Sequence, residues 1–315
     1  MNFWQELKKP IIALAPMAGV TDSAFRQMCK KFGADVMYSE MASVDALYYK
    51  KSAKKTLELV KFKKSEKPYV VQLFGKDPDK YCQAAEIITR EVKPDGIDIN
   101  FGCPAKKVFG HGSGASLMND TKKASQIIKS TLAGTNLPVS IKIRSEVKGV
   151  TAVDFLKEVG LSQISAIMIH GRSYSQGFSG EINYEIIKKV KNMSSIPVLA
   201  NGGINSPKDA KSLLEKTEAD GVGVARGSRG QPWLFKQIKD YLSKGKYQHF
   251  DFEQVKKIII EHAKVSYKEK GEHGIVELRK HLCWYIKGFE GARELRQKLV
   301  RVNNIEEIEK ILKTN

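Results

Sequence analysis

The sequence predicts a closed (β/α)8 barrel followed by a small all-helical domain. Eight short apolar runs, each ending in glycine, asparagine or a charged residue, alternate with helix-like or loop segments. They extend over about 230 residues, close to the ~250 residues of a typical barrel of this kind. After Trp233 the alternation stops, and from Phe250 onward the apolar residues recur at helical spacing. An open doubly wound sheet is the alternative, because the strands are counted from pattern alone.

Each predicted strand is a short β-rich run. In chain order the runs are 11–19, 36–41, 69–75, 96–102, 139–144, 166–171, 197–203 and 221–227. Amphipathic segments such as 79–92 and 206–216 lie between them, and 255–262 and 305–312 are the clearest helical stretches beyond them. The polar segment 242–249 indicates a boundary, so we divide the chain into a barrel domain, residues 1–241, and a helical domain, residues 250–315.

Polar or reactive residues stand at the C-terminal end of nearly every predicted strand. They are Pro16 and Met17, Glu40, Gln72, Asn100 and Cys103, Lys142 and Arg144, His170 and Arg172, Asn201 to Gly203, and Arg226 with Gly227. Active sites of such barrels lie at that end. A single polar residue at a strand end could simply face solvent. Because such residues recur at the same end of nearly every strand, they predict a common site at the barrel mouth.

The last two strands end in glycine-rich loops, Asn201-Gly202-Gly203 and residues 225–230. A barrel commonly binds phosphate between the loops that follow strands 7 and 8. Glycine lets backbone amides approach an anion closely, and Arg226 adds a forked donor. A tight turn alone would explain either loop, but the pair predicts a phosphorylated cofactor or substrate.

A planar ring would fit above the barrel mouth, bordered by Met17, Gln72, Lys142 and His170. The Gln72 amide can make two hydrogen bonds to a pyrimidine-like ring edge, and Lys142 can stabilise negative charge on a reduced flavin. Together with the phosphate loops these residues predict FMN. Each also has a structural interpretation: Gln72 bonded to strand backbone, Lys142 paired with a carboxylate, and His170 satisfied inside the core.

Cys103 stands in a Gly-Cys-Pro turn directly after a predicted strand, where a side chain can meet solvent or a ligand. The other three cysteines, Cys29, Cys82 and Cys283, lie in helical stretches and are predicted to be buried small residues. The four are far apart and show no Cys-x-x-Cys spacing, so neither a metal site nor a disulfide framework is indicated. Cys103 is therefore the reactive candidate.

The formal net charge of +18 favours a polyanionic partner such as nucleic acid, because a basic field attracts phosphate. Lysines that only solvate helix faces are the alternative. No apolar run approaches the ~20 residues needed to cross a bilayer. The first ten residues contain no apolar signal core, so we expect a cytoplasmic protein without membrane contact.

Blocks along almost the whole chain resemble those of the tRNA-dihydrouridine synthases, most closely the B-type bacterial branch. They are Ala15-Pro-Met-Ala-Gly-Val-Thr-Asp22 with Phe25 and Arg26, Asp98-Ile-Asn-Phe-Gly-Cys-Pro-Ala-Lys-Lys107, Lys142-Ile-Arg144, Ile169-His-Gly-Arg172, Asn201-Gly-Gly-Ile204, Arg226-Gly with Gln231-Pro-Trp233, and Arg279-Lys-His-Leu-Cys-Trp-Tyr285. The second block is highly specific. The last is similar to a motif in that family's helical tRNA-binding domain.

The resemblance implies an FMN enzyme that uses NADPH to reduce uridines in tRNA to 5,6-dihydrouridine. Hydride would pass from flavin N5 to C6 of uracil, and Cys103 would protonate C5, since a thiol with a pKa near 8.5 is mostly protonated at neutral pH. Asn100 would fix the uracil edge. The residues implied to hold FMN are Pro16, Met17, Ala18, Gln72, Lys142, His170, Asn201, Gly202, Gly203, Ala225 and Arg226.

The chain departs from the family pattern in two places. Asn201-Gly-Gly-Ile204 stands where the family commonly has Asn-Gly-Asp-Ile, so only a backbone contact is expected from the third position. The loop 109–115 lacks the family's usual basic residue, which His111 replaces in part. Contacts to NADPH or tRNA in this loop are therefore left open, as is the choice between NADPH and NADH.

A uridine in folded tRNA must flip out of its stack to enter a barrel mouth, and phosphate contacts offset the unstacking cost of a few kcal/mol. The residues expected to bind the substrate are Asn100, Lys106, Lys107, Arg144, Arg172, Arg279, Lys280, His281, Arg293 and Arg296. Trp284 and Tyr285 are expected in the core. We expect a monomer without a protein partner; the sequence leaves open which uridines are modified.

Two other functions are compatible with much of this pattern. One is an FMN barrel that oxidises or reduces a free pyrimidine, such as a dihydroorotate or dihydropyrimidine dehydrogenase. The helical domain and the basic charge disfavour it. The other is an RNA-binding protein that has kept the barrel and lost catalysis, which the presence of Cys103 and Lys142 disfavours.

Overall fold

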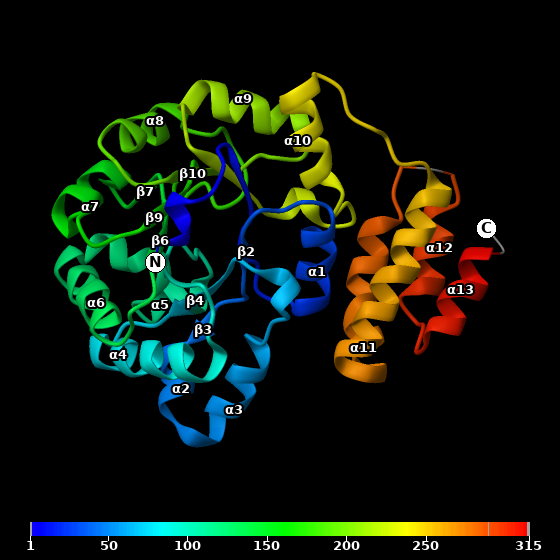
Figure 1. Cartoon of the computed structure of the whole chain (residues 1–315), viewed down its shortest axis with the longest axis horizontal. Helices are drawn as coiled ribbons and strands as arrows, with labels where there is room; N and C mark the ends of the chain where they lie inside the picture. Colours follow the sequence, from blue (N-terminus) through cyan, green and yellow to red (C-terminus); the bar gives the residue numbers. More distant parts are fainter. Residues whose placement is uncertain (1, 289, 314–315) are drawn as a thin grey trace.

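The computed structural model describes residues 2–288 and 290–313 and has a closed barrel of eight parallel strands (Figure 1). The barrel strands are β1 (Ile11–Leu14), β2 (Met37–Tyr38), β4 (Tyr69–Phe74), β5 (Gly96–Phe101), β6 (Val139–Arg144), β9 (Ala166–His170), β10 (Val198–Asn201) and β11 (Gly221–Val224). Each lies within one of the eight predicted runs. The predicted barrel is therefore confirmed, and the open sheet is wrong.

The barrel closes where β1 pairs with β11 on one side and β2 on the other. The register places Ile11 opposite Gly221 and Leu14 opposite Val224. A Cβ at Gly221 would collide with the Ile11 carbonyl oxygen, so glycine permits this close approach. β2 also pairs with β4, which completes the ring.

Helices surround the barrel, as its alternating pattern predicts (Figure 1). They are α1 (Ser23–Lys31), α2 (Val44–Tyr48), α3 (Lys50–Leu59), α4 (Pro78–Ile87), α5 (Lys106–Gly110), α6 (Thr121–Ala133), α7 (Ala152–Val159), α8 (Tyr184–Asn192), α9 (Pro207–Thr217) and α10 (Leu234–Lys244). Sequence signals set their starts: Ser206 and Asp209 form a capping box at α9, where Pro207 occupies the first turn. The segment 79–92 is α4 followed by a π-helical turn, Ile88–Val92.

Short elements complete the barrel domain. β3 (Ala42–Ser43) pairs with the end of β4, and β7 (Glu146–Val147) forms a hairpin with β8 (Val150–Thr151). Single helical turns span Phe3–Gln5, Lys64–Glu66, Gly114–Asn119 and Arg226–Ser228. The first of these turns buries Trp4 against the side chains inside the barrel, among them Tyr38, Val70 and Met168.

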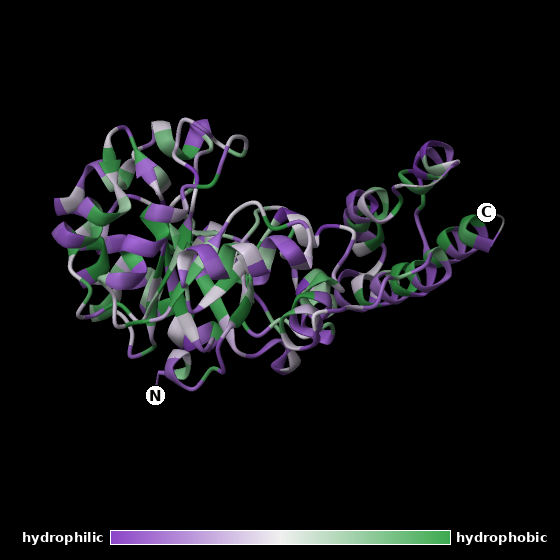
Figure 2. Cartoon of the chain, turned by 90° about the horizontal axis from the view of Figure 1, so that it is seen from above, coloured by the Kyte–Doolittle hydropathy of each residue, from purple (hydrophilic) through white to green (hydrophobic). Residues whose placement is uncertain are grey.

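The helical region consists of α11 (Phe252–Tyr285), α12 (Ala292–Leu299) and α13 (Ile305–Lys313). The predicted helical stretch 255–262 lies inside α11, and the stretch 305–312 lies inside α13. Gly271 has φ 59° and ψ −145°, so α11 is two helices joined at a kink. Figure 2 shows this region extending from one side of the barrel, whose strands concentrate the hydrophobic residues. No described helix is both long and apolar enough to cross a membrane.

The predicted boundary segment 242–249 is partly helical, because α10 continues to Lys244 before the chain leaves the barrel. The helical region has its own core, which includes Ile259, Leu282 and Leu299. Met28 of α1 and Trp233 before α10 join this core. The two regions therefore share buried side chains at their junction.

A buried ion pair anchors α1 to the turn before β4. Arg26 Nε lies 2.5 Å from Glu66 Oε2, and neither side chain is exposed to solvent. The two terminal nitrogens of Arg26 donate to the carbonyl oxygens of Thr21 and Lys61, each at 2.6 Å. Glu66 also accepts hydrogen bonds from the Ser23 hydroxyl and the Lys63 amide. This network fixes the loop that follows β1.

His281, a predicted tRNA-binding residue, is packed between the barrel and the helical region, inside the protein. Its side chain lies against Phe25 of α1 and Trp284, with ring centroids 4.9 Å away in each case. The residue is only 2% exposed, and neither ring nitrogen has a hydrogen-bond partner in the described chain. His262 lies next to it and bonds the Tyr285 hydroxyl at 3.1 Å.

The protein is expected to lose stability as the pH falls below about 6.5, in part because of this histidine. Burial and the nearby His262 hold the pKa of His281 well below its ordinary value, so the ring is neutral in the fold but takes a proton when the chain unfolds. Replacing His281 with leucine is therefore expected to reduce the fall in the free energy of unfolding, by up to about 1.4 kcal/mol per pH unit. Urea unfolding at pH 7.0, 6.0 and 5.0 measures it, and an unchanged slope would contradict the prediction.

Candidate active site

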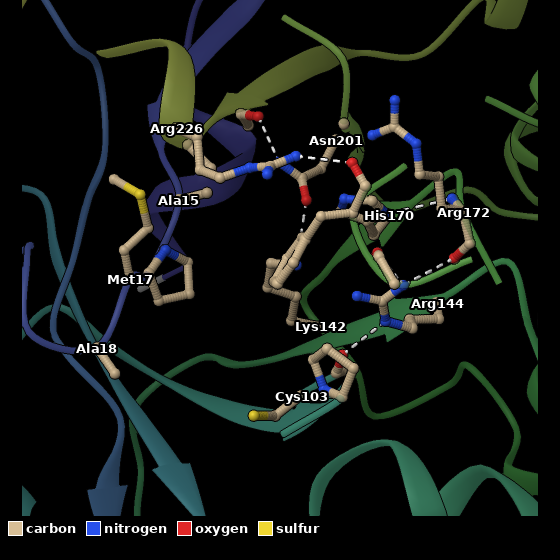
Figure 3. Close-up of a pocket in the computed structure, with 18 of the residues that line it drawn as sticks. Ala15, Met17, Ala18, Cys103, Lys142, Arg144, His170, Arg172, Asn201 and Arg226 are labelled. Carbon is tan, nitrogen blue, oxygen red and sulfur yellow. Dashed lines mark hydrogen bonds between the residues drawn. The ribbon is translucent and has the colours of Figure 1, made fainter. Parts of the chain in front are cut away.

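A cavity of about 990 Å³ lies at the C-terminal ends of the barrel strands, where the sequence predicts the site. Figure 3 shows Met17 and Ala18 on one side of it and Lys142, His170 and Arg172 on the other. The predicted residues that line it are Pro16, Met17, Ala18, Gln72, Asn100, Cys103, Lys106, Lys142, Arg144, His170, Arg172, Asn201, Gly202, Gly203, Ala225 and Arg226. The barrel thus gathers residues from 15 to 229 around one space.

The remaining predicted substrate residues lie outside this cavity. Lys107 is exposed on α5, Arg293 is exposed on α12, and Lys280 is half-buried on α11. Arg279 donates to the Val302 carbonyl oxygen at 2.9 Å and to Asn303 Oδ1 at 2.8 Å. Its Nε and Nη2 donors therefore connect α11 to the loop before α13.

The turn that carries Cys103 is held by Asn100. Asn100 Oδ1 accepts hydrogen bonds from the backbone amides of Gly102, at 3.0 Å, and Cys103, at 2.9 Å. The Cys103 carbonyl oxygen accepts from the Ala115 amide at 3.2 Å, and Gly114, with φ +62°, lies against the Cys103 side chain. The half-buried thiol is thus fixed at the cavity wall.

Gln72 and Asn100 belong to a hydrogen-bonded chain across neighbouring strands. Asn100 Nδ2 donates to Gln72 Oε1 at 2.9 Å, and Gln72 Nε2 donates to Asp98 Oδ2 at 2.8 Å. The Ser140 hydroxyl donates to the other oxygen of Asp98 at 2.7 Å. Burial raises the pKa of Asp98 to about 6. Asn100 Nδ2 also lies 3.7 Å from Met41 Sδ, and Gln72 Nε2 keeps a second hydrogen that can serve a ligand.

Lys142 projects from β6 into the cavity and has no carboxylate within ion-pair distance among the described residues. Its ammonium donates to Asn201 Oδ1 at 3.2 Å, and Asn201 Nδ2 is held by the Gly223 carbonyl oxygen at 2.6 Å. Burial and the nearby positive charge of Arg144 lower the pKa of Lys142 to about 8. An unpaired, desolvated cation of this kind favours an anionic ligand.

His170 ends β9 as a neutral imidazole. Burial, together with the charge of Lys142, lowers the pKa of His170 to about 2. Its Nδ1 accepts a hydrogen bond from the Arg172 amide at 3.1 Å, so the ring proton resides on Nε2. The ring lines the cavity, where Nε2 can donate to a ligand.

Arg144 lines the cavity but is held by backbone carbonyl oxygens, and its contact with the substrate stays a prediction. The residue is 1% exposed. Its Nε donates to the Gly102 carbonyl oxygen at 3.0 Å, and its Nη1 donates to the carbonyl oxygens of Ser173 at 2.7 Å and Gly177 at 2.9 Å. It therefore ties the cysteine turn to the loop after β9. Arg172 is freer: its Nε binds the Gly180 carbonyl oxygen, whereas its Nη1 has no partner in the described chain.

The two glycine-rich loops flank the cavity as predicted. Gly202 and Gly203 have φ values of +115° and +72°, and a Cβ at Gly202 would collide with Ile182. Arg226 follows β11 and donates from Nη2 to the Phe178 carbonyl oxygen at 3.0 Å. Its guanidinium carbon lies 4.5 Å from the centre of the Phe178 ring. The ring steadies the side chain and leaves donors free toward the cavity.

Several cavity residues lie outside the sequence prediction. They are Met41, Tyr174, Phe178, Asn205 and Arg229, among others. Met41 is the last residue of the predicted strand 36–41 and could have been found from that position. Phe178 and Tyr174 come from the long loop between β9 and α8, in which no local signal marks a functional residue. Glu40 ends a predicted strand but turns to the Gly19 amide and does not line the cavity.

Comparisons with known proteins agree with this site. A family model described as dihydrouridine synthase (Dus) matches residues 13–315. The tRNA-dihydrouridine synthase B of Pseudomonas aeruginosa is 36% identical over 300 residues, which cover 93% of this chain and 89% of that protein. A probable tRNA-dihydrouridine synthase of Rickettsia bellii is 38% identical over 296 residues, covering 92% and 90%.

The fold also resembles solved structures of lower sequence identity. A morphinone reductase mutant superposes with a TM-score of 0.53 at 10% identity, covering 80% of this chain and 92% of that one. The histamine dehydrogenase of Rhizobium sp. 4-9 gives 0.56 at 11% identity, covering 81% and 49%. At such identities the likeness concerns the fold alone. The family match over nearly the whole chain is decisive: the chain belongs to the dihydrouridine synthase family.

Proposed function

We propose that the protein binds FMN and uses NADPH to reduce uridines in tRNA to 5,6-dihydrouridine. The observation that carries this proposal is the Cys103 thiol, which Asn100 fixes in the wall of a cavity that also contains the two phosphate loops. The family membership and the printed names of the relatives agree with it.

The residues of the cavity fit FMN. Gly202 and Gly203 line the cavity together with Arg226, and their positive φ values suit a backbone that approaches a phosphate closely. Lys142 is a half-buried cation that forms no ion pair with a carboxylate of the described residues, and a reduced isoalloxazine carries negative charge. The second Gln72 Nε2 hydrogen and the Nε2 hydrogen of His170 supply donors to the ring or its tail. When bound, FMN supplies hydride transfer from NADPH to C6 of the uracil.

The protein's own residues then complete the reduction. Hydride addition at C6 leaves an enolate over C5 and O4 of the uracil, and the Cys103 thiol donates its proton to C5. Solvent at the open mouth returns a proton to the thiolate. Asn100 acts through the cysteine, because its carbonyl oxygen holds the Cys103 amide. Arg172 lines the cavity and is our candidate for a donor to a uracil oxygen.

We propose that tRNA binds across the barrel mouth and the helical region, with the target uridine flipped into the cavity. Lys106 and Lys107 begin α5 directly after the Cys103 turn and are exposed. Lys280, Arg293 and Arg296 are the accessible candidates on the helical region. Residues 1–241 would thus form the catalytic domain and residues 250–315 the domain that orients tRNA.

The test is the dihydrouridine content of unmodified tRNA after incubation with purified protein, FMN and NADPH, mapped by position. Formation at defined positions is expected. A protein that holds flavin and oxidises NADPH but leaves tRNA unchanged would contradict the proposal. Turnover of free uracil or dihydroorotate in that preparation would identify the alternative pyrimidine dehydrogenase.

Replacing Arg226 with alanine is expected to weaken FMN retention by at least about tenfold, because a charge-assisted contact to phosphate is lost. Flavin content per protein after dialysis measures it. Arg90 is exposed, does not line the cavity and pairs with Glu91, so its alanine variant is the matched control. Equal flavin content in both variants would remove Arg226 from the phosphate site.

A further inference from the structure

A second hollow, of about 600 Å³, lies between the barrel mouth and the helical region. One wall comes from the barrel loops, and the other from the end of α11, the segment after it and α12. The lining residues that this inference uses are Arg226, Arg229, Cys283, Trp284, Lys287 and Arg296. Arg226 and Arg229 also line the main cavity, so the two spaces are neighbours that share one loop.

The lining of this hollow is strongly cationic. It contains three arginines and one lysine, and no acidic residue of the described chain is among the lining residues. The Arg229 guanidinium carbon lies 4.9 Å from the centre of the Trp284 ring, and Arg296 Nη1 donates to the Ile286 carbonyl oxygen at 2.7 Å. An arginine has five N–H donors, so both retain donors for a ligand.

The cations of the hollow repel one another without relief from a carboxylate. Burial and the charge of Arg226 lower the pKa of Arg229. Burial and the charge of Arg229 lower the pKa of Lys287 in turn. Within the described residues, no carboxylate offsets the charge of either group. A bound anion would remove this repulsion, and guanidinium with ammonium groups is the donor set that phosphate prefers.

The two walls are held at a fixed distance by backbone contact. Gly230 has φ +70°, and a Cβ there would collide with the Trp284 carbonyl group. Gly227, on the same loop, lies equally close to the Ile204 carbonyl oxygen. The loop that bears Arg229 is thus packed against α11 and against the loop after β10. The hollow is preformed and does not depend on mobile surface side chains alone.

We propose that this hollow is a second phosphate-binding site, beside the site for the flavin phosphate. The source of the phosphate rests on the function proposed above. It is either the 2′-phosphate of NADPH, whose nicotinamide must reach the main cavity, or a backbone phosphate of tRNA beside the flipped uridine. Both present anionic phosphate oxygens to the four cations.

Binding of inorganic pyrophosphate to the flavin-loaded protein tests the site itself, because the flavin phosphate then fills the other position. Calorimetric titration is expected to show at least tenfold weaker binding for Arg229→Gln and Lys287→Glu than for the wild type. Lys298→Glu is the matched control for Lys287→Glu, because it changes the charge equally at a residue that is exposed on α12 and does not line the hollow. Pyrophosphate affinities of Arg229→Gln and Lys287→Glu equal to that of the control would overturn the proposal.

Two further measurements identify the source. The rate of flavin reduction without tRNA is measured for the wild type and both variants, with NADPH and with NADH. A lower rate of the variants that is confined to NADPH assigns the site to the 2′-phosphate. The salt dependence of tRNA binding is measured without NADPH. A slope of log K against log salt concentration that is smaller by about one in the variants assigns the site to an RNA phosphate. If the variants bind pyrophosphate as the control does while the wild-type enzyme makes dihydrouridine, the site alone is refuted. If the variants bind pyrophosphate more weakly but the wild-type enzyme makes no dihydrouridine, the site is supported and the function is refuted.

Discussion

Replacing Cys103 with alanine is expected to lower the rate of dihydrouridine formation by a factor of about 10² to 10⁴, the usual contribution of a positioned general acid. Without the thiol, the uracil enolate loses the acid that we propose for the protonation of C5. The reduction of bound flavin by NADPH is expected to keep its rate, because the Cys103 side chain makes no hydrogen bond in the described chain that holds Lys142 or His170. Stopped-flow absorbance and product analysis separate the two half-reactions.

Cys82→Ala is the control for general loss of a thiol, since Cys82 is half-buried on α4 outside the cavity. Cys103→Ser is expected to lie nearer to alanine than to the wild type, because a hydroxyl is a much weaker acid than a thiol. A Cys103→Ala enzyme that turns over tRNA at the wild-type rate would exclude the cysteine as the proton donor. Equal losses in both half-reactions would instead indicate a damaged flavin site.

Replacing Glu66 with alanine is expected to reduce the free energy of unfolding by about 3–5 kcal/mol, the typical cost of breaking a buried ion pair. The substitution leaves the Arg26 guanidinium buried without its counter-charge, and it removes the acceptor for Ser23 and Lys63. Urea denaturation at pH 7 measures the effect.

The double variant Arg26→Met with Glu66→Leu is the control, because an apolar pair of similar volume removes the uncompensated charge. It is expected to regain most of the lost stability. Arg26 also holds the Thr21 carbonyl oxygen, and Thr21 bonds the Met17 backbone, so flavin retention is expected to remain weakened in the double variant. A double variant no more stable than Glu66→Ala would show that packing, not charge, dominates.

The fold was largely predictable from local patterns. The strands are short apolar runs that end in Gly, Asn or charged residues, and β5 and β10 are found within their predicted ranges. Glycine and polar residues at the strand ends mark the cavity because the topology brings those ends together. The kink at Gly271 was not predicted, since an isolated glycine in an amphipathic segment does not show whether the helix continues.

The partners of individual side chains were not predictable, because they come from distant segments. Arg144 donates hydrogen bonds to the carbonyl oxygens of residues 173 and 177, and the ring of His281 packs against Phe25. Cys82 and Cys283 are half-buried, contrary to prediction, since helical spacing does not fix which side of a helix is covered. The sequence indicates the type of a group, whereas packing decides whether it is free to act.

The contact between Gly230 and the Trp284 carbonyl group also limits how members of this family could be recombined. A hybrid made by joining one protein's barrel to another's helical region would bring together two backbones that evolved separately at this point. Any side chain at position 230 would push the regions apart, and the shared loop would move with them. A crossover point is therefore better placed before Arg226 than in the linker after Lys244, so that the loop and its helical partner are inherited together.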